Sequence, residues 1–333
     1  MPRSTPPVLI YISSFERKTY LKQAVQSALD QTYKNFRILI VDDASTDGAA
    51  ALAQEYAKNY PNRITAITKK INRGVVDSLN QALQNVKKTE YLACLADDDI
   101  FLPEKLKTHM RCFQEKPKTG MLYSDATLID GEGNIIAGDT HDVISMRDGK
   151  MYKERLPIDK LFSDVYHRDE HYRKEITRQL LLVGNFICAT TVILSPPALN
   201  FLNYHVPVAS GASCDWYMWL VISAAFPVVE HKDPLTLYRY GHASSSSTDD
   251  ERLFTLQRES YFIRNYVFRR IVQIRNYVQE EEFLESDHEA ISNLVRDNIR
   301  RQHPFQALTF FMHLLEPPHW KRLPETTTLL SEL

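Results

Sequence analysis

Short apolar runs alternate with helix-spaced apolar residues along the first hundred positions of the chain. Between the runs, apolar side chains recur at every third or fourth position, as in helices that pack one face against a sheet. This alternation predicts an α/β fold in which helices cover both faces of a mostly parallel sheet. Four runs have the length and composition of strands, at residues 8–12, 36–41, 64–67 and 91–96, and the last of them is expected to be fully buried.

The pattern changes after residue 120. Residues 140–178 are polar and show little periodicity apart from a short helix expected near Lys160, so we interpret them as a binding loop or lid. A helix that is apolar on most sides, and hence buried, begins at Cys214. Helices are expected from about residue 249 onward. Further strands or strand pieces are expected at residues 121–125, 127–130, 186–194 and 235–238.

Polar residues follow the predicted strands at their carboxyl ends. Three consecutive carboxylates, Asp97, Asp98 and Asp99, end the fourth run, Asp42 and Asp43 end the second, and residues 13–17 follow the first. Parallel strands bring these ends to one edge of a sheet, where such folds bind ligands. Adjacent carboxylates are hard oxygen donors, so a Mg²⁺ or Mn²⁺ site is expected there. The alternative is an acidic turn that is only solvated.

Composition and charge narrow the class of protein. The 333 residues are 44% hydrophobic and 25% charged, as in soluble globular proteins, and the net charge of −2 gives no field that would attract nucleic acid. Four cysteines without a C-x-x-C pair are typical of a reduced compartment. The sequence has no apolar signal segment at its start and no run of ~18 apolar residues. We therefore expect a cytoplasmic protein that does not span a membrane.

Several motifs occur in a fixed order along the chain. They are residues 8–17, 31–33, 40–47 and 72–74, Asn80, residues 95–100 with Pro103, Asp215-Trp216, and Tyr238-Arg239 with His242. This series resembles the family 2 inverting glycosyltransferases of GT-A fold, over residues 7–245. The resemblance implies a Rossmann-like GT-A catalytic domain at 1–245, with a nucleotide-sugar half at about 7–120 and an acceptor half at about 121–245. Residues 246–333 would then form a C-terminal helical extension.

The resemblance also implies roles for individual donor-site residues. Ser13 and Phe15 would flank the base and ribose, and Asp43 would accept a hydrogen bond from the base. Asp97 would lie near the ribose and the metal, and Asp98 would be the principal metal ligand. The sequence departs from the family at Ala96, where many members carry an acid, and Asp97 would compensate from the next position.

Three further positions complete the expected site. The resemblance implies that Asp215 is the catalytic base, although a carboxylate in the first turn of a helix is also common for structural reasons. Asp43 has a similar alternative, as a helix cap. His242 would complete the metal shell or contact phosphate. Asn185 and three histidines of the polar segment are candidates for acceptor contacts: His141, His167 and His171.

The activity that the resemblance implies is metal-assisted single displacement. A sugar would move from a nucleotide sugar, expected to be a UDP-sugar, to a hydroxyl of a glycan or lipid-linked acceptor in bacterial surface polysaccharide synthesis. Two alternatives stay open: a sugar-phosphate nucleotidyltransferase, although no glycine-rich turn follows the first strand, and a non-catalytic glycan- or nucleotide-binding subunit.

The C-terminal helices are expected to make a further contact. An apolar stripe with basic residues beside it could place them on the inner face of the cell membrane or on an assembly complex, whereas packing on the catalytic domain is the alternative. The stripe consists of Phe305, Leu308, Phe311, Met312 and Leu315.

Overall fold

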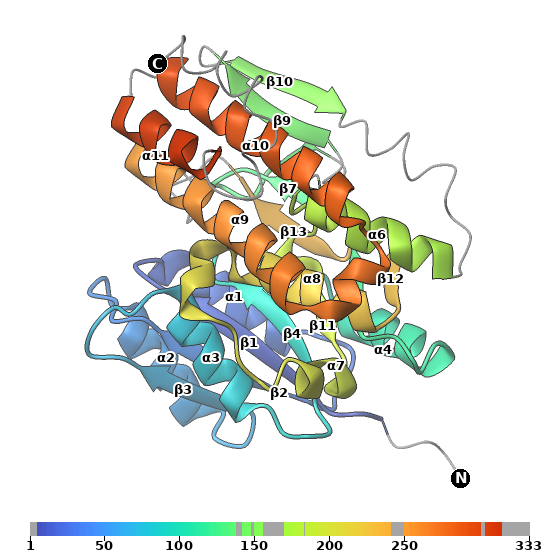
Figure 1. The fold of residues 1–333 in the computed structure, drawn as a ribbon. Helices are drawn as coiled ribbons and strands as arrows, with labels where there is room; N and C mark the ends of the chain where they lie inside the picture. The colour runs from blue at the N-terminus through green and yellow to red at the C-terminus, as the bar shows by residue number, and fades with distance from the viewer. Residues whose placement is uncertain are drawn as a thin grey trace.

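The computed structural model describes residues 5–137, 142–147, 150–155, 170–182, 184–240, 250–300 and 304–314. Within these residues a seven-stranded sheet forms the centre of the molecule (Figure 1), and its strand order is β12-β6-β11-β4-β1-β2-β3. The strands are β1 (Val8–Ser14), β2 (Phe36–Asp42), β3 (Ile64–Thr68), β4 (Tyr91–Ala96), β6 (Met121–Ser124), β11 (Ile193–Leu194) and β12 (Val228–His231).

The strand directions give the sheet one functional edge. Strands β1, β2, β3 and β4 pair in parallel, and β12 pairs in parallel with β6. Strand β11 alone runs antiparallel to its neighbours β4 and β6 among these strands. The prediction of a mostly parallel sheet is therefore confirmed, and the carboxyl ends of β1, β2 and β4 lie at the same edge.

Alternation of side chains along each strand separates two hydrophobic layers. On one face, Val8, Ile10 and Ile12 of β1 pack with helices α1 (Lys18–Leu29), α2 (Ala49–Asn59) and α4 (Lys105–Glu115). On the other face, Leu9 and Tyr11 pack with α3 (Val75–Asn85), α6 (Glu170–Leu182) and α8 (Cys214–Ala225). Strands β1, β2 and β4 are buried on both faces along most of their length, which explains their continuous apolar sequences, whereas the edge strand β3 is buried only at Ile64.

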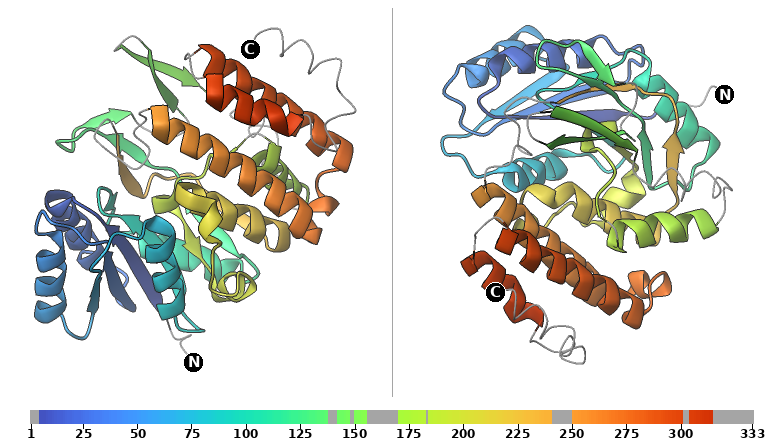
Figure 2. Two further views of the ribbon diagram at one scale, coloured as in Figure 1. Left: turned by 60° about the vertical axis from the view of Figure 1, so that its left-hand side comes forward. Right: turned by 90° about the horizontal axis from the view of Figure 1, so that it is seen from above.

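The C-terminal helices lie outside the second layer. Figure 2, seen from above, shows α9 (Asp250–Arg270) beyond α8, and α10 (Glu280–Arg300) with α11 (Pro304–Leu314) outermost. Ile263 and Val267 of α9 belong to the same hydrophobic cluster as the sheet and α8. Two short helical segments connect these layers: α7 (Pro196–Phe201) precedes the loop to α8, and the 3-10 helix η3 (Val272–Asn276) follows α9. Helices were expected from residue 249, and the structure confirms them.

A smaller sheet covers the end of the central sheet. It contains β5 (Ile100–Phe101), β13 (Thr236–Arg239), β7 (Thr127–Ile129) and β8 (Ile135–Ala137), in that order. Strands β9 (Asp142–Arg147) and β10 (Lys150–Arg155) form a separate hairpin. Because β5 follows the Asp97–Asp99 turn directly, the small sheet holds that turn against the central one.

Two sequence predictions differ from the structure. The single strand expected at 186–194 is a 3-10 turn, η1 (Ala189–Thr191), followed by the two-residue β11. The Thr191 hydroxyl donates to the Cys188 carbonyl (2.7 Å), which closes the chain into a turn before the strand can begin. The segment 140–178, interpreted as a loop, contains β9, β10 and the start of α6. The apolar side chains of α6 begin only at Ile176, so its periodicity is too short to recognise. Lys160 lies outside the described residues.

The end of the chain is described only in part. Ala307 and Phe310 of α11 are buried against Ile291 and Val295 of α10, whereas Met312 is exposed. The structure does not describe the other side chains of the predicted apolar stripe, which are Phe305, Leu308, Phe311 and Leu315. In the part of the chain that the structure covers, no helix combines the length and the apolar character needed to cross a bilayer.

Candidate active site

Three strand ends meet at the edge of the sheet. Ser13 of β1 is paired with Val41 of β2 and with Ala96 of β4, so the residues that follow these three strands are brought together. The Asp43 amide donates to the Ser14 carbonyl (2.9 Å), which continues the pairing one step beyond β2. The predicted donor-site residues therefore lie together at one edge of the sheet: Ser13, Phe15, Asp43, Asp97 and Asp98.

The acidic turn after β4 is buried. Asp97 is 3% exposed, Asp98 8% and Asp99 1%. Burial, reinforced by the charge of Asp98, raises the pKa of Asp97 to about 7, and the same causes raise the pKa of Asp99 well above its usual range. Three adjacent acids in this environment need cations or hydrogen-bond donors, and the structure supplies both.

Arg17 faces the turn from the first strand end. Its Nη1 donates to Asp97 Oδ1 (3.1 Å) and to Asp98 Oδ2 (2.7 Å). The backbone amide of Phe15 donates to the other Asp97 oxygen (3.1 Å). The Phe15 ring itself is 44% exposed at the crevice, so it is available to stack on a base.

Arg239, at the end of β13, holds the turn from the opposite side. Its backbone amide donates to Asp99 Oδ1 (2.9 Å), and its Nε donates to the Asp98 carbonyl (2.8 Å). Nη1 reaches the carbonyls of Asp130 and Gly131, and Nη2 reaches Gln23 of α1. The buried guanidinium therefore ties the acidic turn to three other elements. The role of Asp99 is structural here, because its carboxylate receives the β13 backbone and does not cap α4.

Asp43 organises the neighbouring turn. Its oxygens accept hydrogen bonds from the amides of Arg73 (2.9 Å) and Gly74 (2.7 Å) and from Lys69 Nζ (3.0 Å). Gly74 has φ +82°, a conformation that suits glycine. A carboxylate accepts about four hydrogen bonds, so three donors leave capacity for one more from a ligand. The Ala49 amide at the start of α2 donates to Asp47 and not to Asp43, whereas the Gly74 amide that Asp43 accepts belongs to the N-cap residue of α3.

Asp215 lies in the first turn of α8, as expected. Asn185 Nδ2 donates to Asp215 Oδ2 (3.1 Å), and the Trp216 amide donates to Oδ1 (2.7 Å). Burial raises the pKa of Asp215 to about 6, and these two donors oppose that rise. Asn185, considered as an acceptor contact, is thus a direct partner of Asp215. The structure does not describe the side chains of His141, His167 and His171, the three histidines that were considered with it.

The Cys94 and Cys188 thiols lie near Asp215, and Cys188 also lies near Asp99. Burial raises the pKa of the Cys188 thiol well above its usual value, and the nearby carboxylates of Asp99 and Asp215 raise it further. Cys94, on β4, behaves in the same way near Asp215, and its pKa is about 12. These thiols stay protonated at neutral pH.

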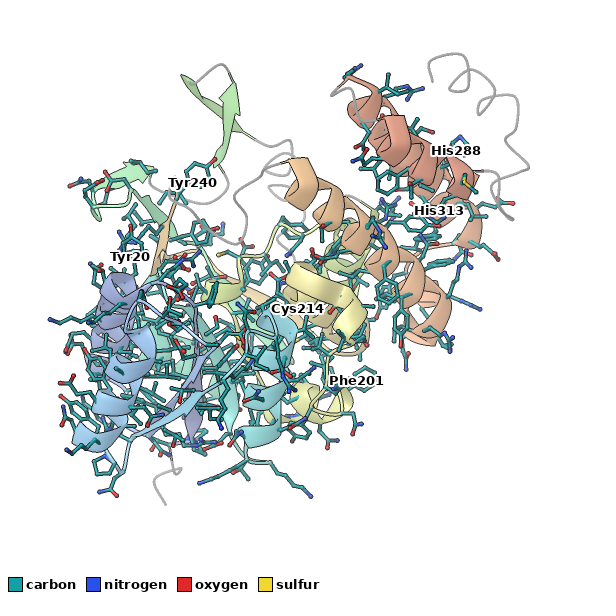
Figure 3. All side chains as sticks on the ribbon, turned by 90° about the vertical axis from the view of Figure 1, so that its left-hand side faces the viewer. Tyr20, Phe201, Cys214, Tyr240, His288 and His313 are labelled. Carbon is teal, nitrogen blue, oxygen red and sulfur yellow. The ribbon has the colours of Figure 1, made fainter. Side chains whose placement is uncertain are left out.

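The loop before α8 is anchored at both ends. Asn80 of α3 donates to the Val206 carbonyl (2.9 Å) and accepts from the Val206 amide (2.8 Å). The 3-10 helix η2 (Val208–Ser213) follows, and the Ala212 amide donates to Glu259 of α9 (2.9 Å). Figure 3 shows Cys214, the residue before Asp215, between the N-terminal layers and the C-terminal helices. Tyr20, also labelled there, has its ring under the Arg239 guanidinium.

The side chains of the acidic turn determine whether a divalent ion fits there. Among the described residues, no three His, Cys, Asp or Glu side chains are grouped as a complete metal site. Asp97 and Asp98, however, each present one oxygen to a single cationic nitrogen, Nη1 of Arg17. Mg²⁺ is usually held by one or two carboxylates together with substrate phosphates. The residues therefore fit an ion that shares its ligands with a diphosphate. His242, the other predicted ligand, lies outside the described residues.

Comparison with known proteins gives the family. The sequence pattern of the family described as "Glycosyl transferase family 2" matches residues 9–187, which is more than half of the chain. The chain belongs to this glycosyltransferase family. It is 34% identical over 128 residues to the putative glycosyltransferase EpsE of Bacillus subtilis, which covers 37% of this chain and 45% of EpsE. It is 31% identical over 135 residues to the chondroitin synthase of Escherichia coli, covering 40% of this chain and 19% of that protein. The match thus spans less than half the length of these relatives.

Solved structures share the fold. S. aureus TarS 1-349 in complex with UDP has a TM-score of 0.52 at 14% identity, covering 91% of this chain and 87% of that one. The mannosyltransferase PcManGT from Pyrobaculum calidifontis, in complex with GDP-Man and Mn²⁺, has a TM-score of 0.53 at 13% identity, covering 99% and 87%. The GT-A architecture predicted from the motifs is confirmed.

Proposed function

We propose that this protein is a metal-dependent inverting glycosyltransferase. It would transfer a sugar from a nucleotide sugar, a UDP-sugar, to a hydroxyl of a glycan or lipid-linked acceptor in bacterial surface polysaccharide synthesis. The observation that carries the proposal is the meeting of the β1, β2 and β4 strand ends, which brings Asp43, Asp97 and Asp98 to one edge of the sheet. Family membership, the UDP-bound TarS neighbour and the chondroitin synthase relative support it.

The donor side binds and orients the nucleotide sugar. Asp43, with its remaining acceptor capacity, would take a hydrogen bond from the base, while Ser13 and the exposed Phe15 ring would lie against base and ribose. Asp98 would be the main protein ligand of the ion, with Asp97 beside it and His242 as a further ligand. When bound, such an ion stabilises the negative charge that develops on the departing diphosphate.

The acceptor side moves one proton. The acceptor hydroxyl oxygen forms a bond to the anomeric carbon as the bond from that carbon to the diphosphate oxygen breaks, and the hydroxyl proton goes to the Asp215 carboxylate. With a pKa of about 6, Asp215 is mostly ionised at neutral pH and remains a competent base. One base and one displacement give inversion, and the reaction needs no covalent nucleophile.

Product analysis tests the proposed function. The protein is incubated with UDP-sugars and MnCl₂, first alone and then with glycan acceptors, and released UDP is measured together with the anomeric configuration of the product. We expect UDP release and an inverted linkage. The same protein given nucleoside triphosphates and sugar 1-phosphates should release no pyrophosphate. Pyrophosphate release, or a complete lack of UDP release from every donor, would contradict the proposal.

A further inference from the structure

One cationic nitrogen occupies the space between the two predicted metal ligands. Arg17 Nη1 is 2.7 Å from Asp98 Oδ2 and 3.1 Å from Asp97 Oδ1. The Arg17 side chain is 20% exposed, whereas the carboxylates are nearly covered. Arg17 therefore holds one carboxylate oxygen of each predicted ligand, and a divalent ion at Asp98 would compete with it.

The charge of Arg17 is permanent. Burial acts to lower its pKa, but the carboxylates of Asp98 and Asp97 outweigh this and raise the pKa above the usual value. A guanidinium is always protonated in proteins, so it neutralises part of the acidic turn at every pH at which the protein is folded. Without this cation, the buried acids would repel one another.

The backbone around Arg17 is fixed on both sides. The Glu16 amide donates to Ser45 Oγ (2.9 Å), and the Glu16 carboxylate accepts from the Thr46 amide (2.7 Å). The Lys18 amide donates to Asp47 Oδ2 (2.7 Å). Any movement that frees Asp98 is therefore a rotation of the Arg17 side chain and leaves the loop in place.

We propose that Arg17 is an exchangeable counter-ion of the metal site, an inference that rests on the proposed function. Before the donor binds, Arg17 holds Asp97 and Asp98. When a divalent ion and a nucleoside diphosphate enter together, Arg17 releases Asp98 to the ion and turns its guanidinium to the phosphate oxygens. Arginine forks bind phosphate with paired hydrogen bonds, so the donor replaces the contact that Arg17 loses.

This exchange predicts coupling between metal and nucleotide. Mn²⁺ alone must displace Arg17 from Asp98 without itself supplying an acceptor for the guanidinium, whereas Mn²⁺ with UDP supplies the phosphate oxygens. The two ligands should therefore bind cooperatively, and the coupling must be equal in both directions. Because charged hydrogen bonds are stronger than neutral ones, the coupling that depends on Arg17 should be about tenfold or more.

The test measures Mn²⁺ affinity by electron paramagnetic resonance, with and without UDP, in wild type, Arg17→Gln, Arg17→Lys and Lys18→Gln. In Arg17→Gln we expect Mn²⁺ alone to bind about tenfold more tightly, and the enhancement by UDP to fall by about tenfold. Arg17→Lys keeps the charge but not the paired donors, so Mn²⁺ alone should bind as in wild type while the enhancement by UDP falls in part. Lys18→Gln removes the neighbouring exposed charge and serves as the matched control. Thermal unfolding confirms that each variant is folded.

Two results would overturn the inference: Mn²⁺ affinity in Arg17→Gln without UDP that is unchanged or weaker, or an unchanged UDP enhancement. Asp98→Asn in the same assay separates this failure from failure of the proposed function. If Asp98→Asn loses Mn²⁺ while Arg17→Gln behaves as wild type, only the exchange is wrong. If Asp98→Asn binds Mn²⁺ as wild type does, the metal assignment itself is wrong. Should Arg17→Gln fail to fold, the decision falls to Arg17→Lys. The exchange would be rejected if, in Arg17→Lys, the enhancement of Mn²⁺ affinity by UDP fell by the same factor as the affinity for UDP itself.

Discussion

The two sides of the proposed site are built in different ways: the donor side contains Asp43 and Asp98, and the base side contains Asp215. On the donor side, Asp43 follows β2 and Asp98 follows β4, the two parallel strands that flank β1, so the sheet itself places them. On the base side, Asp215 depends on Asn185, thirty residues earlier, and on a loop that Glu259 of α9 holds from the C-terminal region. The donor side is therefore a property of the sheet, whereas the base side is a property of contacts between distant parts of the chain.

This difference means that the two sides should fail separately. Substitutions on the donor side should remove binding and turnover together, because they remove the group that holds the leaving diphosphate. Substitutions on the base side should remove turnover and leave nucleotide binding intact. We expect the effects of such substitutions on turnover to decrease in the order Asp98, Asp215, Asn185 and Glu259.

Asp98→Asn should have the largest effect. Loss of one anionic metal ligand removes part of the charge stabilisation at the leaving group, which is worth several kcal/mol, so turnover should fall by about 10³-fold or more. Mn²⁺-dependent UDP affinity, measured by calorimetry, should fall with it, and removal of the metal with EDTA should reproduce both losses in wild type. Turnover near the wild-type rate would reject Asp98 as the ligand.

Asp215→Asn should follow, with turnover reduced by about 10²–10⁴-fold, the usual contribution of a general base. The amide keeps the shape and can still receive the Trp216 amide bond, so the helix should remain in place. UDP affinity should stay within about twofold of wild type. An equal loss of binding and turnover would mean that Asp215 is structural.

Asn185→Ala should change the pH dependence. The base acts when ionised, so the rate in wild type should rise with pH through a midpoint near 6. The thiols that face Asp215, Cys94, Cys188 and Cys214, have raised pKa values and stay neutral over this range. Asn185 opposes the rise in the Asp215 pKa, so its loss should move the midpoint upward and lower the rate most below pH 7. An unshifted kcat–pH profile, with the exposed Asn200→Ala as control, would contradict this.

Glu259→Ala should have the smallest effect. It removes the acceptor of the Ala212 amide and loosens the loop before Asp215, so kcat should fall by about three- to tenfold while UDP affinity is unchanged. Glu259→Gln retains an acceptor oxygen and is the matched control. If UDP affinity falls as much as kcat, α9 supports the whole fold and has no separate link to the base.

The same comparison explains what the sequence could reveal. The strands and the Asp97–Asp99 turn were predictable because burial on both faces leaves a continuous apolar run that ends abruptly in acids. Residues 13–17, which include Arg17, were expected at the same edge, but the pairing of these acids with Arg17 and Arg239 was not predictable. The two arginines reach the acids across about 80 and 140 residues of sequence, and nothing local marks such pairs. Arg239 appeared only as part of a motif, and its position after an apolar strand was the one available signal.

Local turns also limited the prediction on the base side. Residues 186–194 are apolar and β-branched enough to indicate a strand, but the Thr191 hydroxyl closes a 3-10 turn instead. That turn, and the Asn185 contact just before it, shape the surroundings of Asp215. Asp215 could be proposed as the base from the resemblance alone, whereas its hydrogen-bond partners required the structure.

The central claim is that Asp98, at the end of β4, coordinates the ion that holds the donor diphosphate. Crystals grown with UDP and MnCl₂, with diffraction data collected at the manganese absorption edge, test it most directly. We predict one strong anomalous peak in direct contact with the Asp98 carboxylate and with both phosphates of UDP. A manganese peak bound to the diphosphate but remote from the Asp97–Asp99 turn would contradict the account.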